Sequence, residues 1–265
     1  VTRTGVEIMD SNGKPVIRKM QRSSSSALMV DKGNYRHFML KEIYEQPEVI
    51  SHTLSHYLDF ATGKAFHEPD LPADTLASLR YCKQNGQTIA SIVNVTESTI
   101  ARESDVVFPT LAGPEIGVAS TKAFTCQLSV LAALAVRAGV ERGHIDADAE
   151  REMVAALSAV PRLTSMALAQ DEEIESLARE LSKARHALYL GRGTNFPLAQ
   201  EGALKLKEIS YIHAEGYAAG ELKHGPIALV DEDMPVIVIA PHDNVFEKTV
   251  SNMQEVAARG GQIIL

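Results

Sequence analysis

Side chains suited to proton transfer gather in one short stretch of the sequence. On an α-helix, Glu201, Lys205 and Glu208 lie at positions i, i+4 and i+7 and project from a single stripe. His224 follows in a stretch rich in Gly, Ala, His and Glu. Carboxylates, an amine and an imidazole are the groups that general acid–base catalysis uses. The spacing therefore predicts a proton-transfer site on this helix.

The same spacing also has a purely structural interpretation. Glu at i with Lys at i+4 is the usual pattern of a solvated helix salt bridge. The opposite stripe is small and apolar and predicts close packing on a sheet; it contains Ala199, Gly202, Leu206 and Ile209. The stretch after the helix shows no clear period, and long irregular segments inside compact domains are often functional. That context favours the chemical interpretation.

Composition narrows the class of partner. The chain has 265 residues, no Trp and a formal net charge of −8, which argues against nucleic acid as a partner. An anionic substrate stays possible, because helix N-termini bind phosphate locally. The apolar run around 128–136 is too short to span a bilayer. With only Cys82 and Cys126, we expect a soluble cytoplasmic protein with buried thiols and no membrane partner.

The order of elements in the second half predicts a parallel α/β fold. Apolar strands alternate with helices, which indicates a sheet covered on both faces. The expected strands are 187–190, 236–240 and 262–265, and the expected helices are 195–210 and 244–259. Ligands in such folds lie beyond the carboxyl ends of the strands. Gly191 and Gly193 occupy one such end, and 240–243 another.

The first half is incomplete by the same standard. Helices are expected at 36–57, 73–85 and 120–138, strands at 88–95 and 106–110, and charged bridging helices over 146–183. A doubly wound half should open with a strand and a phosphate-binding turn, and the sequence before 88–95 provides neither. We expect a missing segment there. Because the first residue is not Met and the last four read as a strand cut at its end, we also expect a fragment.

Several long runs resemble one enzyme family. They are Tyr35–Pro47, Ser98–Asp105, Gly113–Phe124, Glu201–Glu215 and Gly220–Pro226. Together they are similar to the sugar-isomerising (SIS) part of the glutamine–fructose-6-phosphate aminotransferase (isomerizing) family, the glucosamine-6-phosphate synthases. The resemblance covers nearly the whole chain, and runs of this length do not recur by chance.

The resemblance implies an organisation and an activity. It implies two flavodoxin-like SIS subdomains with parallel sheets covered on both faces, at 37–142 and 143–265, the first incomplete near 60–73 and the second truncated at its C-terminus. Residues 1–36 resemble the remnant of a glutaminase domain and its linker. The implied reaction converts fructose 6-phosphate and ammonia to glucosamine 6-phosphate in a homodimer, without a metal or other cofactor. Glutamine would supply the ammonia through an N-terminal glutaminase domain that this chain lacks.

The resemblance also assigns roles to residues. Glu208 matches the base that moves a proton between C1 and C2, and burial near the apolar sheet would raise its pKa toward the working pH. Lys205 matches a lysine that stabilises oxyanion charge, and Glu201 matches an acidic neighbour. His224 matches the ring-opening histidine, which comes from the neighbouring subunit. The residues that match contacts to the sugar are Val118, Ala119 and Ser120.

Two departures from the family bear on activity. The family's Cys-Gly-Thr-Ser-like turn and Ser-Gln-Ser-Gly-Glu-Thr loop, which hold the sugar phosphate, should lie between Phe66 and Ala73. The family's imine-forming lysine lies in a C-terminal tail beyond Leu265. We therefore expect this chain alone to be inactive.

Alternatives remain at several positions. Ser120 and Thr121 also read as an N-cap for the following helix. His213, Glu215 and His224 have ligand-type side chains but span an irregular loop without a closed metal set. Lys122 reads as a surface or capping lysine. For the whole chain, a non-catalytic sugar-phosphate sensor and a related deglycase or isomerase share the fold. The acid–base residues argue against the sensor, and the glutaminase-like residues 1–30 argue against the deglycase or isomerase.

Overall fold

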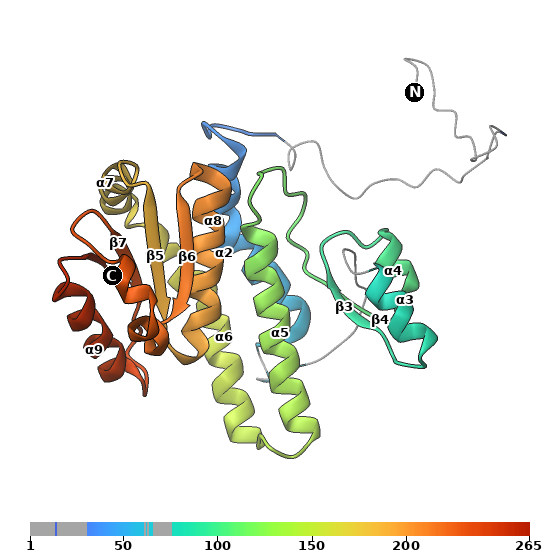
Figure 1. The fold of residues 1–265 in the computed structure, drawn as a ribbon. Helices are drawn as coiled ribbons and strands as arrows, with labels where there is room; N and C mark the ends of the chain where they lie inside the picture. Colours follow the sequence, from blue (N-terminus) through green and yellow to red (C-terminus); the bar gives the residue numbers. More distant parts are fainter. Residues whose placement is uncertain (1–13, 15–30, 61, 63, 66–75) are drawn as a thin grey trace.

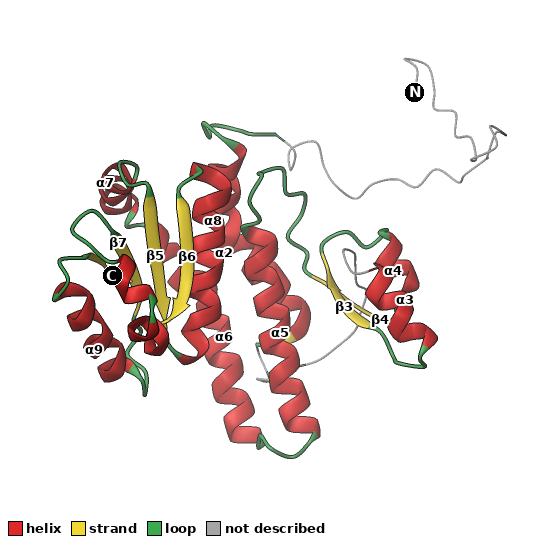
Figure 2. Ribbon diagram, viewed as in Figure 1, coloured by secondary structure: helices red, strands yellow, loops and turns green. Residues whose placement is uncertain are grey.

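The computed structural model describes residue 14 and residues 31–60, 62, 64–65 and 76–265 of the chain. The glutaminase-like segment up to residue 30 and the expected break between Phe66 and Ala73 lie outside the described residues. The described part forms two α/β halves joined by long helices (Figures 1 and 2).

The second half is built on a four-stranded parallel sheet. Its strands are β5 (His186–Gly191), β6 (His213–Ala218), β7 (Pro235–Ile239) and β8 (Gln262–Ile264), in the spatial order β6-β5-β7-β8. In chain order this is second, first, third, fourth, which is the flavodoxin-like arrangement. The predicted parallel α/β fold is confirmed.

Helices cover both faces of this sheet, and the strands alternate accordingly. Leu188, Leu190, Val236 and Val238 pack in one core together with Val256 of α9 (Phe246–Ala257). The intervening side chains face the other way, toward α8 (Phe196–Ser210): Ala187, Tyr189 and Ile237 pack with Ala203 and Leu206. Each face of the sheet is therefore buried by one helix layer.

Strand β6 was not predicted from the sequence. Its residues, His213–Ala218, include Gly and Ala, which have low strand propensity. The small residues are required by the close approach of α8, because a Cβ on Gly216 would lie 2.6 Å from the Cα and N of Gln200. The prediction that this whole stretch is irregular was wrong: its first part is a sheet strand, and η2 (Ala219–His224) follows directly.

The first half contains a small sheet and a helical layer. β3 (Ala90–Val93) and β4 (Val106–Pro109) pair in parallel, and α3 (Leu76–Gln84) and α4 (Thr99–Glu103) flank them. β1 (Leu58–Asp59) and β2 (Lys64–Ala65) form a short antiparallel pair. The long helices are α2 (Phe38–Tyr57), α5 (Lys122–Glu141) and α6 (Ala147–Leu168), and α7 (Asp171–Leu181) leads into the second half.

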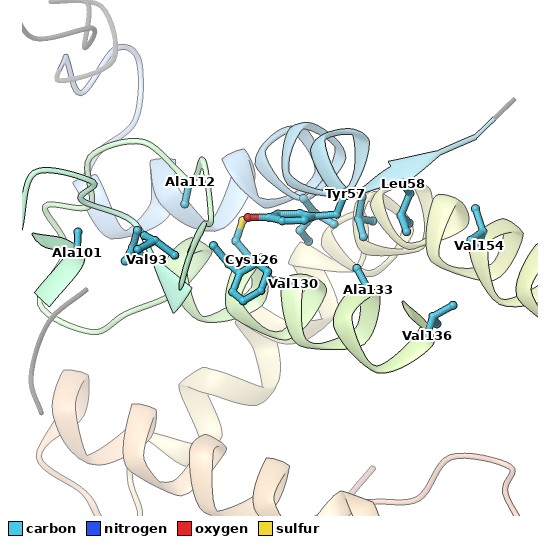
Figure 3. Close-up of a cluster of buried hydrophobic side chains, with 14 residues drawn as sticks. Tyr57, Leu58, Val93, Ala101, Ala112, Cys126, Val130, Ala133, Val136 and Val154 are labelled. Carbon is cyan, nitrogen blue, oxygen red and sulfur yellow. The ribbon is translucent and has the colours of Figure 1, made fainter. Parts of the chain in front are cut away.

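The core of the first half lies between its long helices and the small sheet (Figure 3). Leu54 and Tyr57 of α2 meet Cys126 and Val130 of α5 there, and all four side chains are fully buried. Val154 of α6 joins the same cluster, so this core extends beyond the predicted boundary at residue 142. By length and composition alone α5 would suffice to cross a membrane, but its buried face belongs to this core.

Candidate active site

The start of α8 is fixed by a tight turn at the end of β5. Gly191 has no room for a side chain, because a Cβ would lie 2.0 Å from the Asn195 carbonyl oxygen. Gly193 has φ +58°, a conformation that glycine adopts without strain. Farther along the helix, a Cβ on Gly202 would lie 2.8 Å from the Tyr189 ring. These contacts set the rotation of α8 on the sheet.

That rotation directs Glu201, Lys205 and Glu208 away from the core, and we call these residues the α8 cluster. The Lys205 Nζ lies 3.3 Å from Glu201 Oε1 and 2.8 Å from Glu208 Oε2. The three side chains are 24%, 25% and 33% exposed for Lys205, Glu201 and Glu208. The predicted juxtaposition on one stripe is therefore present, within reach of solvent.

The carboxylates control the charge of Lys205. Partial burial lowers the pKa of the Lys205 ammonium, but hydrogen bonds from Lys205 to Glu208 and Glu201 outweigh that effect, so the pKa is raised. Lys205 is thus a cation at neutral pH. Such a group stabilises developing negative charge and does not serve as a nucleophilic amine.

Glu208 is not buried, so that prediction was wrong. It lies in the last turn of α8, beside Ile209, which is 57% exposed, and Tyr211, which is 95% exposed. The residues of α8 that pack on the sheet are Ala199, Gly202, Ala203 and Leu206. Ile209, expected in that stripe, extends past it. In this chain the sheet does not desolvate the Glu208 carboxylate.

His224 lies at the opposite end of the sheet from Glu208. The chain leaves α8 at Ser210, runs along β6 from His213 to Ala218 and then enters η2, whose last residue is His224. A six-residue strand spans about 20 Å at roughly 3.3 Å per residue. His224 is exposed, and among the described residues no hydrogen bond or ion pair joins it to the α8 cluster. The two groups do not meet within one chain.

Val118, Ala119 and Ser120 belong to the loop at residues 113–121, which precedes α5. Val118 is 89% exposed, whereas Ala119 is 1% exposed. The Ser120 Oγ donates to Glu115 Oε2 at 3.0 Å. Val118 therefore projects into solvent, whereas Ala119 and Ser120, which follow it, are held against the protein.

The predicted side-chain cap of α5 is absent. Thr121 occupies the N-cap position without a side-chain cap. Instead the Glu115 carboxylate accepts from the Thr121 N–H at 2.7 Å and the Ala123 N–H at 3.3 Å. A carboxylate at a helix N-terminus is also favoured by the helix dipole. Glu115 thus takes the role expected of Ser120 and Thr121.

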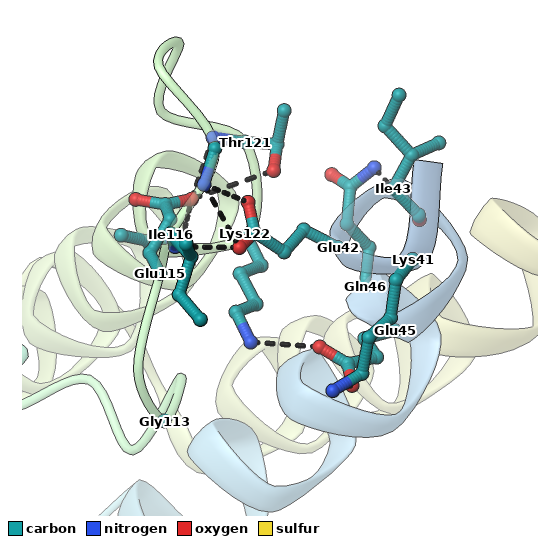
Figure 4. Close-up of polar contacts among 12 residues, drawn as sticks. Lys41, Glu42, Ile43, Glu45, Gln46, Gly113, Glu115, Ile116, Thr121 and Lys122 are labelled. Carbon is teal, nitrogen blue, oxygen red and sulfur yellow. Dashed lines mark hydrogen bonds and ion pairs between the residues drawn. The ribbon is translucent and has the colours of Figure 1, made fainter. Parts of the chain in front are cut away.

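Buried charges on α2 support the same region and were missed from the sequence (Figure 4). Glu42 is 2% exposed and accepts hydrogen bonds from the 113–121 loop. Its position in the buried stripe of α2, with Ile50, Thr53 and Leu54, was the available signal. A charged residue in a core stripe indicates a specific partner.

Lys122 was predicted as a surface or capping lysine, and that prediction was wrong. Its side chain is 4% exposed, and its Nζ lies 2.7 Å from Glu45 Oε2. Lys41 contacts the other oxygen of Glu45 at 3.3 Å. We call Lys41, Glu45 and Lys122 the α2–α5 cluster. It joins the beginning of α2 to the beginning of α5.

The carboxyl edge of the second sheet is closed by pairs of polar side chains. Asn195 Nδ2 donates to Asp243 Oδ2 at 3.1 Å, across the ends of β5 and β7. Arg192 Nη1 donates to Asn252 Oδ1 at 3.0 Å. These hydrogen bonds link the loops after β5 and β7 and the helix α9 at this edge of the sheet.

The possible metal ligands do not assemble. His213 Nε2 lies 3.6 Å from Glu215 Oε1, and the Tyr217 hydroxyl donates to the same carboxylate. In the part of the chain that the structure describes, no group of three His, Cys, Asp or Glu side chains is arranged to hold a metal ion.

Comparison with known proteins gives consistent matches. The SIS domain model matches residues 68–137 and 180–265. The structure is similar to the C-terminal domain of glucosamine-fructose-6-phosphate aminotransferase from Francisella tularensis, with a TM-score of 0.82 and 37% identity, over 89% of this chain and 84% of that one. A glucosamine-6-phosphate deaminase from Thermotoga maritima shares the fold at a TM-score of 0.65 and 19% identity, over 86% of this chain and 84% of that one.

Two curated sequences match this chain at higher identity than the solved structures above. The glutamine–fructose-6-phosphate aminotransferase (isomerizing) of Mesorhizobium japonicum is 57% identical, over 100% of this chain and 54% of its own length. That of Agrobacterium fabrum is 56% identical with the same coverage. The chain thus spans about half the length of these relatives. Both alignments extend over 330 residues, whereas this chain has 265.

Proposed function

The chain belongs to the SIS domain family, within the sugar-isomerising part of the glutamine–fructose-6-phosphate aminotransferases, and from that premise we propose that it acts on fructose 6-phosphate. The α8 cluster carries the proposal. Its lysine lies between two carboxylates at 2.8 and 3.3 Å, partly exposed and at a family-matched position. A fixed cation beside available carboxylates suits proton transfer next to a carbonyl.

The proposed reaction has two stages. Ammonia adds to C2 of the open-chain ketose, and loss of water leaves an imine. Glu208 then takes a proton from C1 and delivers one to C2, while the C1 hydroxyl loses its proton and the imine nitrogen gains one, which gives the amino aldose glucosamine 6-phosphate. Lys205 stabilises negative charge that develops on the sugar oxygen during the transfer, and Glu201 helps to hold the Lys205 ammonium in place.

The source of ammonia and the phosphate contacts lie outside this chain in the proposal. The relatives are named as glutamine-dependent enzymes and are about twice as long. Their alignment is longer than this chain, which supports a missing segment that would carry the phosphate loops between Phe66 and Ala73. We infer a cytoplasmic enzyme with a separate glutaminase domain.

His224 completes the site from a second subunit in the proposal. Its position beyond the carboxyl end of β6 separates it from its own Glu208, so a shared site in a homodimer is the arrangement that brings them together. His224 would then open the sugar ring in the partner's site. The same reasoning predicts that Glu208 and His224 of a single chain do not form a complete site.

Turnover distinguishes the enzyme from a sugar-phosphate sensor. The 265-residue chain, and the same chain with the corresponding segment of the Mesorhizobium japonicum relative inserted between Phe66 and Ala73, are incubated with fructose 6-phosphate and ammonium. We expect neither of these two proteins to form glucosamine 6-phosphate. We call the version that carries both the inserted segment and the C-terminal tail of the relative the completed protein, and we expect it to form glucosamine 6-phosphate. Tight binding of fructose 6-phosphate by the completed protein without any product would support the sensor.

Subunit mixing tests the shared site. Inactive His224→Ala and Glu208→Gln versions of the completed protein are mixed under conditions that exchange subunits. A heterodimer then has one site with both defects and one with neither, so up to about a quarter of the parent activity returns with random exchange. No recovery after demonstrated exchange would place His224 in its own subunit's site.

A further inference from the structure

We propose that Glu42 is a positioning residue that holds the 113–121 loop in the shape required for contact with the sugar. The proposal rests on the function proposed above, because Val118, Ala119 and Ser120 lie in this loop. Glu42 itself is buried in α2, behind the loop, so the proposal gives it no contact with the sugar. It acts through the backbone of the loop.

The Glu42 carboxylate accepts consecutive backbone N–H groups. Its Oε1 lies 2.6 Å from the Ile116 N and 3.0 Å from the Gly117 N, and its Oε2 lies 3.1 Å from the Gly117 N. Hydrogen bonds to an ionised carboxylate are shorter and stronger than those between neutral groups. Figure 4 shows Glu42 extending from α2 to the loop beside Ile116. The contact spans 74 positions of sequence.

Gly117 is the complementary half of this contact. A Cβ added there would lie 2.6 Å from Glu42 Oε2 and 2.7 Å from the end of the Met39 side chain. Any larger residue would have to displace the carboxylate from the N–H groups that it accepts. Glu42 and Gly117 therefore form one unit, although nothing in their sequence neighbourhoods links them.

Further contacts fix the rest of the loop. Asn94 Nδ2 donates to the Gly113 carbonyl at 2.6 Å, at the beginning of the loop. Glu115 accepts from Ser120 and Thr121 at its end. Only Val118 and Ala119 lie between the Glu42 contact and the Glu115 contact. The loop is thus held at its beginning, middle and end, and the short stretch between the last two contacts carries the exposed Val118.

Rigid presentation matters because catalysis depends on sub-ångström placement of substrate. Displacing a positioning group by about 1 Å can reduce rate by roughly 100-fold. Loss of Glu42 would leave the Ile116 and Gly117 N–H groups without their acceptor, so the loop would reorganise to find water. We therefore expect the sugar contacts at Val118–Ser120 to weaken when Glu42 is changed.

Amide hydrogen exchange tests the contact between Glu42 and the 113–121 loop without any sugar. In the 265-residue chain, Glu42→Ala should raise exchange at Ile116 and Gly117 by about 10-fold or more, since their acceptor is lost. Glu42→Gln keeps one acceptor oxygen and should give an intermediate increase. Glu150→Ala is the control, because Glu150 is a second buried carboxylate in the same half but lies on α6. Unchanged exchange at Ile116 and Gly117 in Glu42→Ala would overturn the proposal.

A double substitution tests whether Glu42 and Gly117 act as one unit. Gly117→Ala alone should increase exchange in the loop nearly as much as Glu42→Ala. In the double variant the new Cβ has room, because the carboxylate is gone and only the flexible end of Met39 must move. The double variant should therefore resemble Glu42→Ala alone. Additive effects would contradict a shared contact.

The role toward sugar is read from KM in the completed protein described above. Glu42→Ala should raise KM for fructose 6-phosphate by about 10-fold, and Gly117→Ala should add little to it. Glu150→Ala should leave KM unchanged at a temperature where all variants are folded. A mobile loop with unchanged KM would overturn the positioning role. If the completed parent neither binds nor converts fructose 6-phosphate, the proposed function fails, and with it the sugar role of Glu42. The exchange data then still decide whether Glu42 holds the 113–121 loop.

Discussion

The α8 cluster and the α2–α5 cluster use the same residue types in opposite settings. Lys205 and its carboxylates are about one-quarter to one-third exposed, whereas the Lys122 side chain is 4% exposed. Each cluster contains a Lys–Glu pair at i,i+4, namely Lys41–Glu45 and Glu201–Lys205. The α2–α5 cluster joins two packed helices through the buried Lys122, although Glu45 itself is 25% exposed, whereas the α8 cluster lies on one helix and faces solvent. Spacing alone therefore does not distinguish a structural ion pair from a chemical one.

What differs is the surface that covers each cluster. α5 and α2 pack on one another and exclude water from Lys122, so its pair with Glu45 is part of the fold. α8 packs on the sheet through its opposite stripe, which leaves Lys205 accessible. We conclude that a charged pair becomes a candidate for chemistry where the fold positions its residues but does not cover them.

Removing the buried lysine should have the largest effect on stability. Lys122→Met leaves Glu45, whose side chain is 25% exposed, with only Lys41. Because the lysine is buried but Glu45 reaches solvent, we expect a loss of about 2 kcal/mol of unfolding free energy, below the roughly 3–5 kcal/mol of a fully buried pair. Denaturant unfolding of the 265-residue chain measures this value. A change below about 1 kcal/mol would contradict this expectation and show that burial of Lys122 adds nothing to its pair with Glu45.

The unfolding free energy should also fall at high pH because of Cys126, which lies in the core of the first half. Burial raises the pKa of the Cys126 thiol to about 11, although a hydrogen bond with Thr53 and the charge of Lys122 oppose the shift. Because the folded-state pKa exceeds the unfolded value of about 9, this contribution is complete below pH 9 and falls away as pH rises toward 11. The expected loss is about 2–3 kcal/mol.

The matched control for that prediction is Cys126→Ala. The difference between parent and variant isolates the thiol from the tyrosines and lysines that titrate in the same range. An identical pH dependence in both proteins would contradict the assignment. Thiol labelling at pH 8 should modify the partly exposed Cys82 and leave Cys126 unmodified in the folded chain.

Removing the exposed lysine should have the smallest effect on stability. Lys205→Met, the same substitution as in the buried cluster, should change the unfolding free energy by less than about 1 kcal/mol, because solvent replaces the exposed pair. The measurement is the same denaturant unfolding. A loss as large as that of Lys122→Met would remove the contrast between the two clusters.

The sequence predicted the regular, strongly periodic parts of the fold well. The helix expected at 195–210 is α8, Phe196–Ser210, and the strand expected at 187–190 is β5, His186–Gly191. These elements have apolar stripes or runs and clear Gly boundaries. The parallel sheet and its helical layers follow from their alternation. The exact division into subdomains stays a prediction.

The sequence failed where long-range packing decides. β6 has an Ala- and Gly-rich sequence because α8 approaches it closely, and no local propensity shows that. The Glu42 contact joins residues far apart in the chain. Burial of Lys122 and exposure of Glu208 reverse what was expected, because each depends on which helix face a distant segment covers. The spacing of the α8 cluster was predictable because it is local to one helix.

The central claim is that Glu208 transfers a proton between C1 and C2 of the sugar. The direct measurement, made with the completed protein and ammonium in D₂O, is deuterium incorporation at C1 of fructose 6-phosphate and at C2 of the glucosamine 6-phosphate that forms. Glu208→Gln should slow incorporation by about 10² to 10⁴-fold while binding of the sugar phosphate is retained. Glu175→Gln, which alters an exposed carboxylate paired with Arg179 on α7, should leave the rate unchanged. Incorporation at the parent rate in Glu208→Gln would contradict the account and assign the base elsewhere.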